Sequence, residues 1–159
     1  MIRTAAKYFP VGLILLAVCA GGCDSDNGDA GSLDEAFVGD WVLVGVEDDT
    51  GDRYGEVTDA YHQISLTMQD GGGAVIAADG IDDADDLTVA GSYAVSEPNG
   101  TLTLTLTVSG VGEIPLTFAF EFTGSDSIRL TATGLTVTAL NAVLGASLAG
   151  STEMTFDRD

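Results

Sequence analysis

Strict alternation of apolar and polar side chains is the feature that most constrains the fold of this chain. From Thr101 to Val108, every second residue is Leu or Val and the residues between them are threonines. From Ile114 to Phe122, Ile, Leu and Phe alternate with Pro, Thr, Ala and Glu. Successive side chains of a strand point to opposite faces, so each segment has one apolar face and one polar face. This pattern is typical of an antiparallel sheet with one face in the core and the other in water.

The same period of two predicts strands elsewhere in the chain. Trp41 and Leu43 share one face of the first of these segments, and Val42, Val44 and Val46 share the other. Acidic or glycine-rich turns separate the segments. The further predicted strands cover residues 38–46, 64–69, 74–78, 87–95, 128–132 and 152–156.

Two stretches depart from strand periodicity. Residues 33–37 fit a short turn of helix before the first strand. Within residues 135–150, Leu140, Val143, Leu144 and Leu148 are spaced like one helical face, which predicts a short helix. The beginning of this stretch, residues 135–138, also fits a strand.

Eight predicted strands with short turns favour an all-β domain over residues 37–159. We expect an eight-stranded antiparallel up-and-down barrel, which leaves no open sheet edge, with one short helix before the last strand. A β-sandwich that buries the single tryptophan is the alternative.

The N-terminal residues predict export. Arg3 and Lys7 precede an apolar run that is shorter than the roughly 20 residues needed to span a bilayer, so residues 1–22 are a predicted signal peptide. The sequence from Ala20 to Cys23 resembles the lipobox of bacterial lipoproteins. This resemblance implies that Cys23 becomes the acylated first residue of the mature chain and anchors it to a membrane.

Residues 23–36 form a predicted acidic, flexible tether, because they contain mainly Asp, Gly, Ser and Ala. The net charge of the chain is −20, which argues against nucleic acid as a partner, since nucleic-acid binding depends on Lys and Arg. No cysteine follows Cys23, so the exported domain relies on its core and not on a disulfide. The expected location is the bacterial cell envelope, with the outer membrane or cell surface favoured.

Gly39 and Trp41 on the first strand, followed by antiparallel strands and Arg158 on the last, resemble a bacterial lipocalin-like domain. In that family the tryptophan closes one end of the barrel and a late arginine lies over its indole. The resemblance therefore implies that Gly39, Trp41 and Arg158 close this barrel. It also implies an apolar interior, in which the candidate ligand-lining residues are Leu43, Leu66, Val89, Tyr93, Leu104, Phe118, Phe120 and Leu130.

Two functions follow from such a barrel. If the interior is hollow, it would bind a small apolar ligand. If it is filled, the same residues are simply the core, and the protein would serve as a structural or interaction lipoprotein that meets an envelope protein.

The chain offers little for catalysis or metal binding. His62 is the only histidine and shares the parity of Ile64, which predicts an inward position at one end of the barrel. No nucleophile-elbow motif occurs, so we expect neither an enzyme nor a cofactor. The acidic loop supplies weak Ca²⁺ candidates but lacks the spacing of an EF-hand; these candidates are Asp79, Asp82, Asp83, Asp85 and Asp86.

Overall fold

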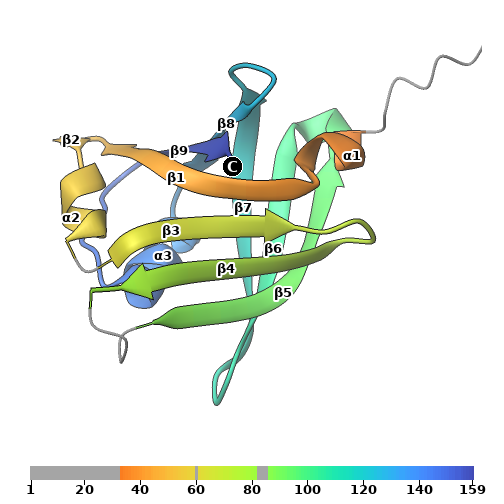
Figure 1. Ribbon diagram of the computed structural model, residues 1–159. Helices are drawn as coiled ribbons and strands as arrows, with labels where there is room; N and C mark the ends of the chain where they lie inside the picture. The colour runs from red at the N-terminus through yellow and green to blue at the C-terminus, as the bar shows by residue number, and fades with distance from the viewer. Residues whose placement is uncertain (1–32, 60, 82–85) are drawn as a thin grey trace, which may run out of the picture. The chain divides into compact units, whose positions relative to one another are not determined.

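A computed structural model describes residues 33–59, 61–81 and 86–159, most of which lie in antiparallel strands (Figure 1). The strands are β1 (Gly39–Asp48), β2 (Gly51–Asp52), β3 (Tyr61–Met68), β4 (Gly73–Gly80), β5 (Leu87–Ser96), β6 (Thr101–Val108), β7 (Gly112–Phe122), β8 (Ser127–Ala132) and β9 (Thr152–Arg158). The helices are α1 (Leu33–Phe37), α2 (Tyr54–Thr58) and α3 (Leu135–Leu144), with one 3₁₀ turn, η2 (Glu97–Asn99). The predicted signal peptide and Cys23 lie outside the described residues, as does most of the predicted tether.

The strands form a closed barrel. Each strand from β3 to β9 pairs with the next, and β1 pairs with both β3 and β9. Trp41 therefore stands opposite Leu66 on one side and Arg158 on the other. The short β2 pairs with β1 alone, so β1 and β3–β9 make the eight-stranded antiparallel barrel. The predicted barrel is confirmed, and the β-sandwich alternative is wrong because the β1–β9 pairing closes the sheet.

The alternation in the sequence places the core inside the barrel. Leu102, Leu104 and Leu106 of β6 are at most 2 % exposed, whereas the threonines between them are half-buried on the outer face. Burying a side chain of this size contributes roughly 1.5–3 kcal/mol relative to leaving it in water. The apolar face that predicted the strands is thus also the main source of stability.

A β-bulge in β1 changes one prediction. The pairing of β1 with β9 shifts register between Leu43 and Gly45, and this inserts an extra residue. Val44 is consequently 43 % exposed, while Val46 turns inward and is only 1 % exposed. The prediction that Val46 lies on the face opposite Trp41 and Leu43 is wrong beyond the bulge.

A second irregularity affects the histidine. The register of β3 and β4 shifts between Tyr61 and Gln63, and His62 is exposed. The predicted inward position of His62 is therefore wrong, because parity with Ile64 does not continue through the irregularity.

Gly91 on β5 is required by close strand packing. A Cβ atom at this position would collide with the backbone carbonyl oxygen of Thr105 on β6. Only a residue without a side chain allows β5 and β6 to approach this closely.

Helices α1 and α2 lie at the two ends of β1. Helix α1 precedes β1, and α2 follows the β1–β2 hairpin at its other end (Figure 1). Helix α3 begins after Gly134 and ends at Gly145 in a left-handed conformation with φ 66°, which is a common glycine helix stop. The helix before the last strand is thus confirmed; α2 was not predicted. Within the described ranges, no helix has the length and apolar character needed to cross a membrane.

Candidate functional site

The candidate site is a small cavity inside the barrel. Its volume is about 40 Å³. Of the candidate ligand-lining residues, five border it: Leu43, Leu66, Leu104, Phe118 and Leu130. Among the described side chains around it, only Ser65 carries a hydroxyl and none carries a charge. The cavity is therefore an apolar space without an acid–base group on its wall.

The cavity is much smaller than a ligand site. Pockets that hold drug-sized molecules measure roughly 300–1,000 Å³. In this conformation the barrel is almost filled by its own side chains. A ligand larger than a few atoms can enter only if part of the wall moves.

Helix α3 supplies the part of the wall that lies outside the barrel. Leu140, Val143 and Leu144 border the cavity together with residues from the strands. Glycines with positive φ stand at both ends of this helix, Gly134 at 57° and Gly145 at 66°. No charged residue occurs between Arg129 and Glu153. We call α3 and the following residues 145–151 the α3 cover.

The α3 cover completes the barrel where a strand stops. The β7–β8 pairing ends at Phe118 and Ala132, beyond which the backbone of Thr117 has no partner on β8. The Thr136 hydroxyl accepts a hydrogen bond from Thr117 N and donates one to Thr117 O, both at 3.2 Å. A side chain of α3 thus satisfies backbone groups that would otherwise be unpaired.

Asn141 connects the two halves of the α3 cover. Its Nδ2 donates to Leu148 O and its Oδ1 accepts from Leu148 N, each at 2.8 Å. Leu148 is buried, so this pair of bonds also fixes an apolar residue of the cover.

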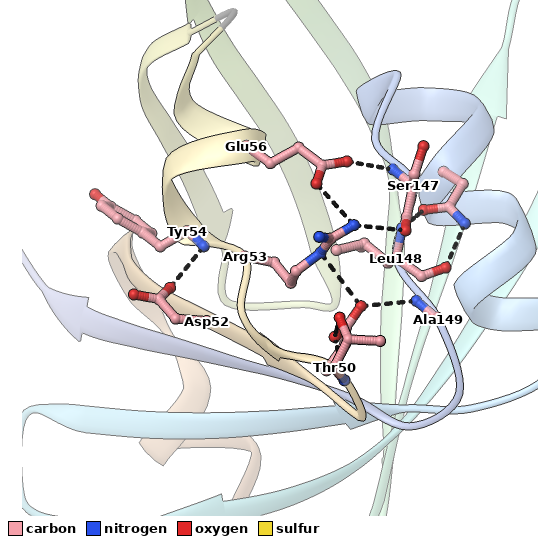
Figure 2. A network of polar contacts seen from close by, with 10 residues as sticks. Thr50, Asp52, Arg53, Tyr54, Glu56, Ser147, Leu148 and Ala149 are labelled. Atoms are coloured by element: carbon pink, nitrogen blue, oxygen red, sulfur yellow. Dashed lines mark hydrogen bonds and ion pairs between the residues drawn. The ribbon is translucent and has the colours of Figure 1, made fainter.

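A polar network holds the α3 cover to the β1–β2–α2 region (Figure 2). Arg53 forms ion pairs with Glu56 at 2.7 Å and with Asp48 at 3.4 Å, and its Nη2 donates to Ser147 O at 3.0 Å. The same carboxylates accept from the backbone of the cover: Glu56 from Ser147 N and Asp48 from Ala149 N, both at 3.0 Å. We call these contacts the Arg53 network.

Asp48 is the titratable centre of the Arg53 network. Its side chain has no accessible surface. The hydrogen bond from the Thr50 hydroxyl is the largest cause that lowers the pKa of Asp48; burial opposes it, and the bonds from backbone N–H groups and the charge of Arg53 support it. The carboxylate is therefore stabilised in the charged form that the network needs.

Gly39, Trp41 and Arg158, the residues predicted to close the barrel, lie together at the opposite end of β1. The guanidinium carbon of Arg158 lies 4.5 Å from the centre of the Trp41 ring, within cation–π distance. Arg158 also donates to the carbonyl oxygens of Val38 at 3.0 Å and Ala36 at 2.9 Å. Gly39 has φ 144°, and a Cβ there would lie only 3.0 Å from Arg158 Nη1. Glycine at this position thus permits the positive φ and leaves room for the Arg158 side chain.

Helix α1 and an aromatic cluster fill the same end. Trp41 Nε1 donates to Phe37 O at 2.8 Å. The Phe37 ring packs 4.9 Å from Phe120 and 5.0 Å from Phe122. Phe120 therefore belongs to this cluster and does not border the cavity, contrary to the prediction that it lines a ligand site.

Val89 and Tyr93 were also candidate ligand-lining residues, and neither borders the cavity. Both are buried on β5. Burial, followed by the nearby charges of Asp34 and Asp70, raises the pKa of the Tyr93 phenol. Tyr93 therefore belongs to the core near α1 and the β3–β4 turn.

The metal candidates are not brought together in the described chain. Asp79 is exposed, and Asp86 accepts a hydrogen bond from Gly80 N at 3.0 Å; Asp82, Asp83 and Asp85 lie outside the described residues. In residues 33–59, 61–81 and 86–159, no group of three or more His, Cys, Asp or Glu side chains is arranged to hold a metal ion.

Comparison with known proteins gives distant similarities in structure. No protein-family model and no curated protein matches the chain. A lipocalin-like protein from Bacteroides uniformis ATCC 8492 has 17% identity and a TM-score of 0.48, over 78% of this chain and 99% of that chain. A redesigned beta barrel has 14% identity and a TM-score of 0.47, over 79% and 94%. The structure of EF1p2_mFAP2b bound to DFHBI has 16% identity and a TM-score of 0.43, over 79% and 95%.

Proposed function

We propose that this chain is an exported, lipid-anchored protein of the bacterial cell envelope whose barrel binds a small apolar ligand without catalysis. The observation that carries the binding role is the apolar cavity beneath α3. The strands around it are fixed by hydrogen bonds to their neighbours on both sides, whereas α3 is joined to the barrel by side chains and is bounded by glycines. Displacing α3 would remove Leu140, Val143 and Leu144 from the wall and enlarge the space.

The absence of charge on the α3 cover supports this route. In a chain of net charge −20, the cover combines an apolar inner face with an uncharged outer one. An apolar molecule that enters beneath α3 therefore does not have to displace water from a charged side chain of the cover. The Arg53 network would then hold the cover closed over the bound ligand.

Anchoring rests on the sequence before the barrel. Cys23 follows a lipobox-like Ala-Gly-Gly, and α1 begins at Leu33, a short distance along the chain. Replacing Cys23 with serine should release the protein from membranes, as measured by fractionation and by the mass of the N-terminal peptide. Unchanged fractionation and peptide mass would contradict acylation.

Native mass spectrometry tests binding directly. In the Cys23→Ser protein, purified without detergent, we expect a non-covalent small-molecule mass that disappears on denaturation. Val143→Phe, which fills the cavity from α3, should abolish this mass. Ala142→Phe, on the exposed side of the same helix, should retain it. An apo mass that does not change on incubation with apolar compounds would contradict the binding role.

A filled barrel that acts as a protein-interaction module is the second candidate. The cavity of about 40 Å³ favours it, because such a space needs no ligand. An apo wild-type protein with no uptake, recovered with an envelope protein after cross-linking, would support this second function over the first.

A further inference from the structure

The inner surface of the barrel contains a polar group that the fold leaves unused. Thr152, the first residue of β9, is 0 % exposed, and its Oγ1 has no hydrogen-bond partner within the described residues. The other buried threonine, Thr136, is fully used by its two bonds to Thr117. A buried hydroxyl without a partner is costly, and such groups are rare in native proteins.

The position of Thr152 relates it to the candidate site. Thr152, Met154 and Phe156 are the buried residues of β9 and share its inner face. Met154 and Phe156 border the cavity. Thr152 does not border it in this conformation, but it continues the same inner face of β9 toward the α3 cover, which ends at Ser151, so displacement of the cover would bring the cavity to it. The residue opposite on β8 is Ala132, whose methyl group leaves the hydroxyl beside a small neighbour.

The charges near this end limit what Thr152 could bind. The core residues of the described barrel carry no charge. The surface hollow beside Thr152 is bordered by Ser151 and four acids: Glu47, Asp48, Asp49 and Glu153. The cations near this end are already paired: Arg53 with Asp48 and Glu56, and Arg129 with Glu121 and Glu153. A carboxylate ligand would find no free cation here and would be repelled by the acids.

We propose that the ligand is an uncharged amphiphile, an apolar chain with one hydrogen-bonding group such as a hydroxyl, and that Thr152 Oγ1 binds this group beneath the α3 cover. This assignment rests on the proposed binding function. It accounts for the unpartnered hydroxyl: Thr152 gains its partner when the ligand is bound.

Three chain-matched probes test the assignment: octanol, octanoate and octane, titrated at neutral pH into the Cys23→Ser protein and followed by NMR chemical shifts. Wild type should bind octanol more tightly than octane and should bind octanoate most weakly. Thr152→Val should weaken octanol binding by about three- to tenfold, the value of one hydrogen bond, and leave octane binding unchanged.

Two further variants keep the test decisive. Thr152→Ser retains the hydroxyl and should retain the preference for octanol. Thr155→Val, on the outer face of the same strand, should bind all three probes like wild type. If Thr152→Val binds octanol as wild type does, or if octanoate binds most tightly, the role of Thr152 is wrong while the binding function stands. If wild type binds none of the probes, both are wrong.

Discussion

Truncating Leu140, one of the apolar side chains that α3 places over the cavity, should destabilise the protein strongly. Leu140 is 5 % exposed and borders the cavity, so Leu140→Ala enlarges a space that the structure cannot easily refill. The loss of transfer free energy is about 0.8 kcal/mol for each of the three carbon atoms removed. Adding the penalty for the enlarged cavity gives an expected loss of about 3–4 kcal/mol in the free energy of unfolding.

The measurement is urea unfolding followed by the fluorescence of Trp41, the only tryptophan. The midpoint should fall while the m-value stays unchanged, since the native state remains compact. Leu135→Ala is the matched control: it is the same substitution on the same helix, at a residue that is 87 % exposed. Its effect should stay within about 0.5 kcal/mol.

The same variant links stability to binding. A larger cavity and a less firmly packed α3 should increase the affinity for octane, and bound octane should then recover part of the lost stability in proportion to the logarithm of its concentration. A loss below about 1 kcal/mol for Leu140→Ala, or a loss equal to that of Leu135→Ala, would refute the packing of α3 over the barrel interior.

Three further predictions concern the rest of the barrel. Trp41→Ala should cost about 3–5 kcal/mol in urea unfolding followed by circular dichroism, because the ring is fully buried; a wild-type emission maximum typical of an indole in water would contradict this. Gly91→Ala should cost about 1–3 kcal/mol because its methyl group meets the β6 backbone, whereas Gly55→Ala, with open space around it, should be neutral or stabilising in the same assay. The folded-state pKa of Asp48 is lowered, so its contribution is present above about pH 4 and is lost as the pH falls through the folded pKa. The difference in unfolding midpoint between wild type and Asp48→Asn should therefore be present at neutral pH and disappear in acid; a constant difference would contradict the role of the charged carboxylate.

Much of the fold could be predicted because the alternation that forms a barrel is local in the sequence. Thr101 to Val108 and Ile114 to Phe122 specify strands and their inner faces without any tertiary information. The bulge after Leu43 could not be predicted in the same way. It depends on how β1 is matched to β9 far along the chain, and it reverses the direction of Val46.

Only part of the candidate site could be predicted from the sequence, again because local alternation does not contain the tertiary arrangement. Parity correctly placed Leu43 and Phe118 toward the interior, but parity gives no position along the barrel, so it did not separate the cavity from the aromatic cluster that holds Phe120. The spacing of Leu140 and Val143 indicated a helical face. The surface that this helical face covers depends on the path of the loop between α3 and β9. The sequence of that loop carries no clear signal for its path.

The pairing of β1 with β9 has a consequence for how the protein is made. It joins the first and last strands of the described chain, with Trp41 opposite Arg158, and so has the longest sequence separation of any strand pair in the barrel. Contacts of this kind slow folding, because a long loop must be closed before they form. A nascent chain that lacks β9 has an open sheet with β1 at one edge and Trp41 without its arginine. Folding of the barrel can therefore finish only after β9 is available, because β9 closes the sheet against β1.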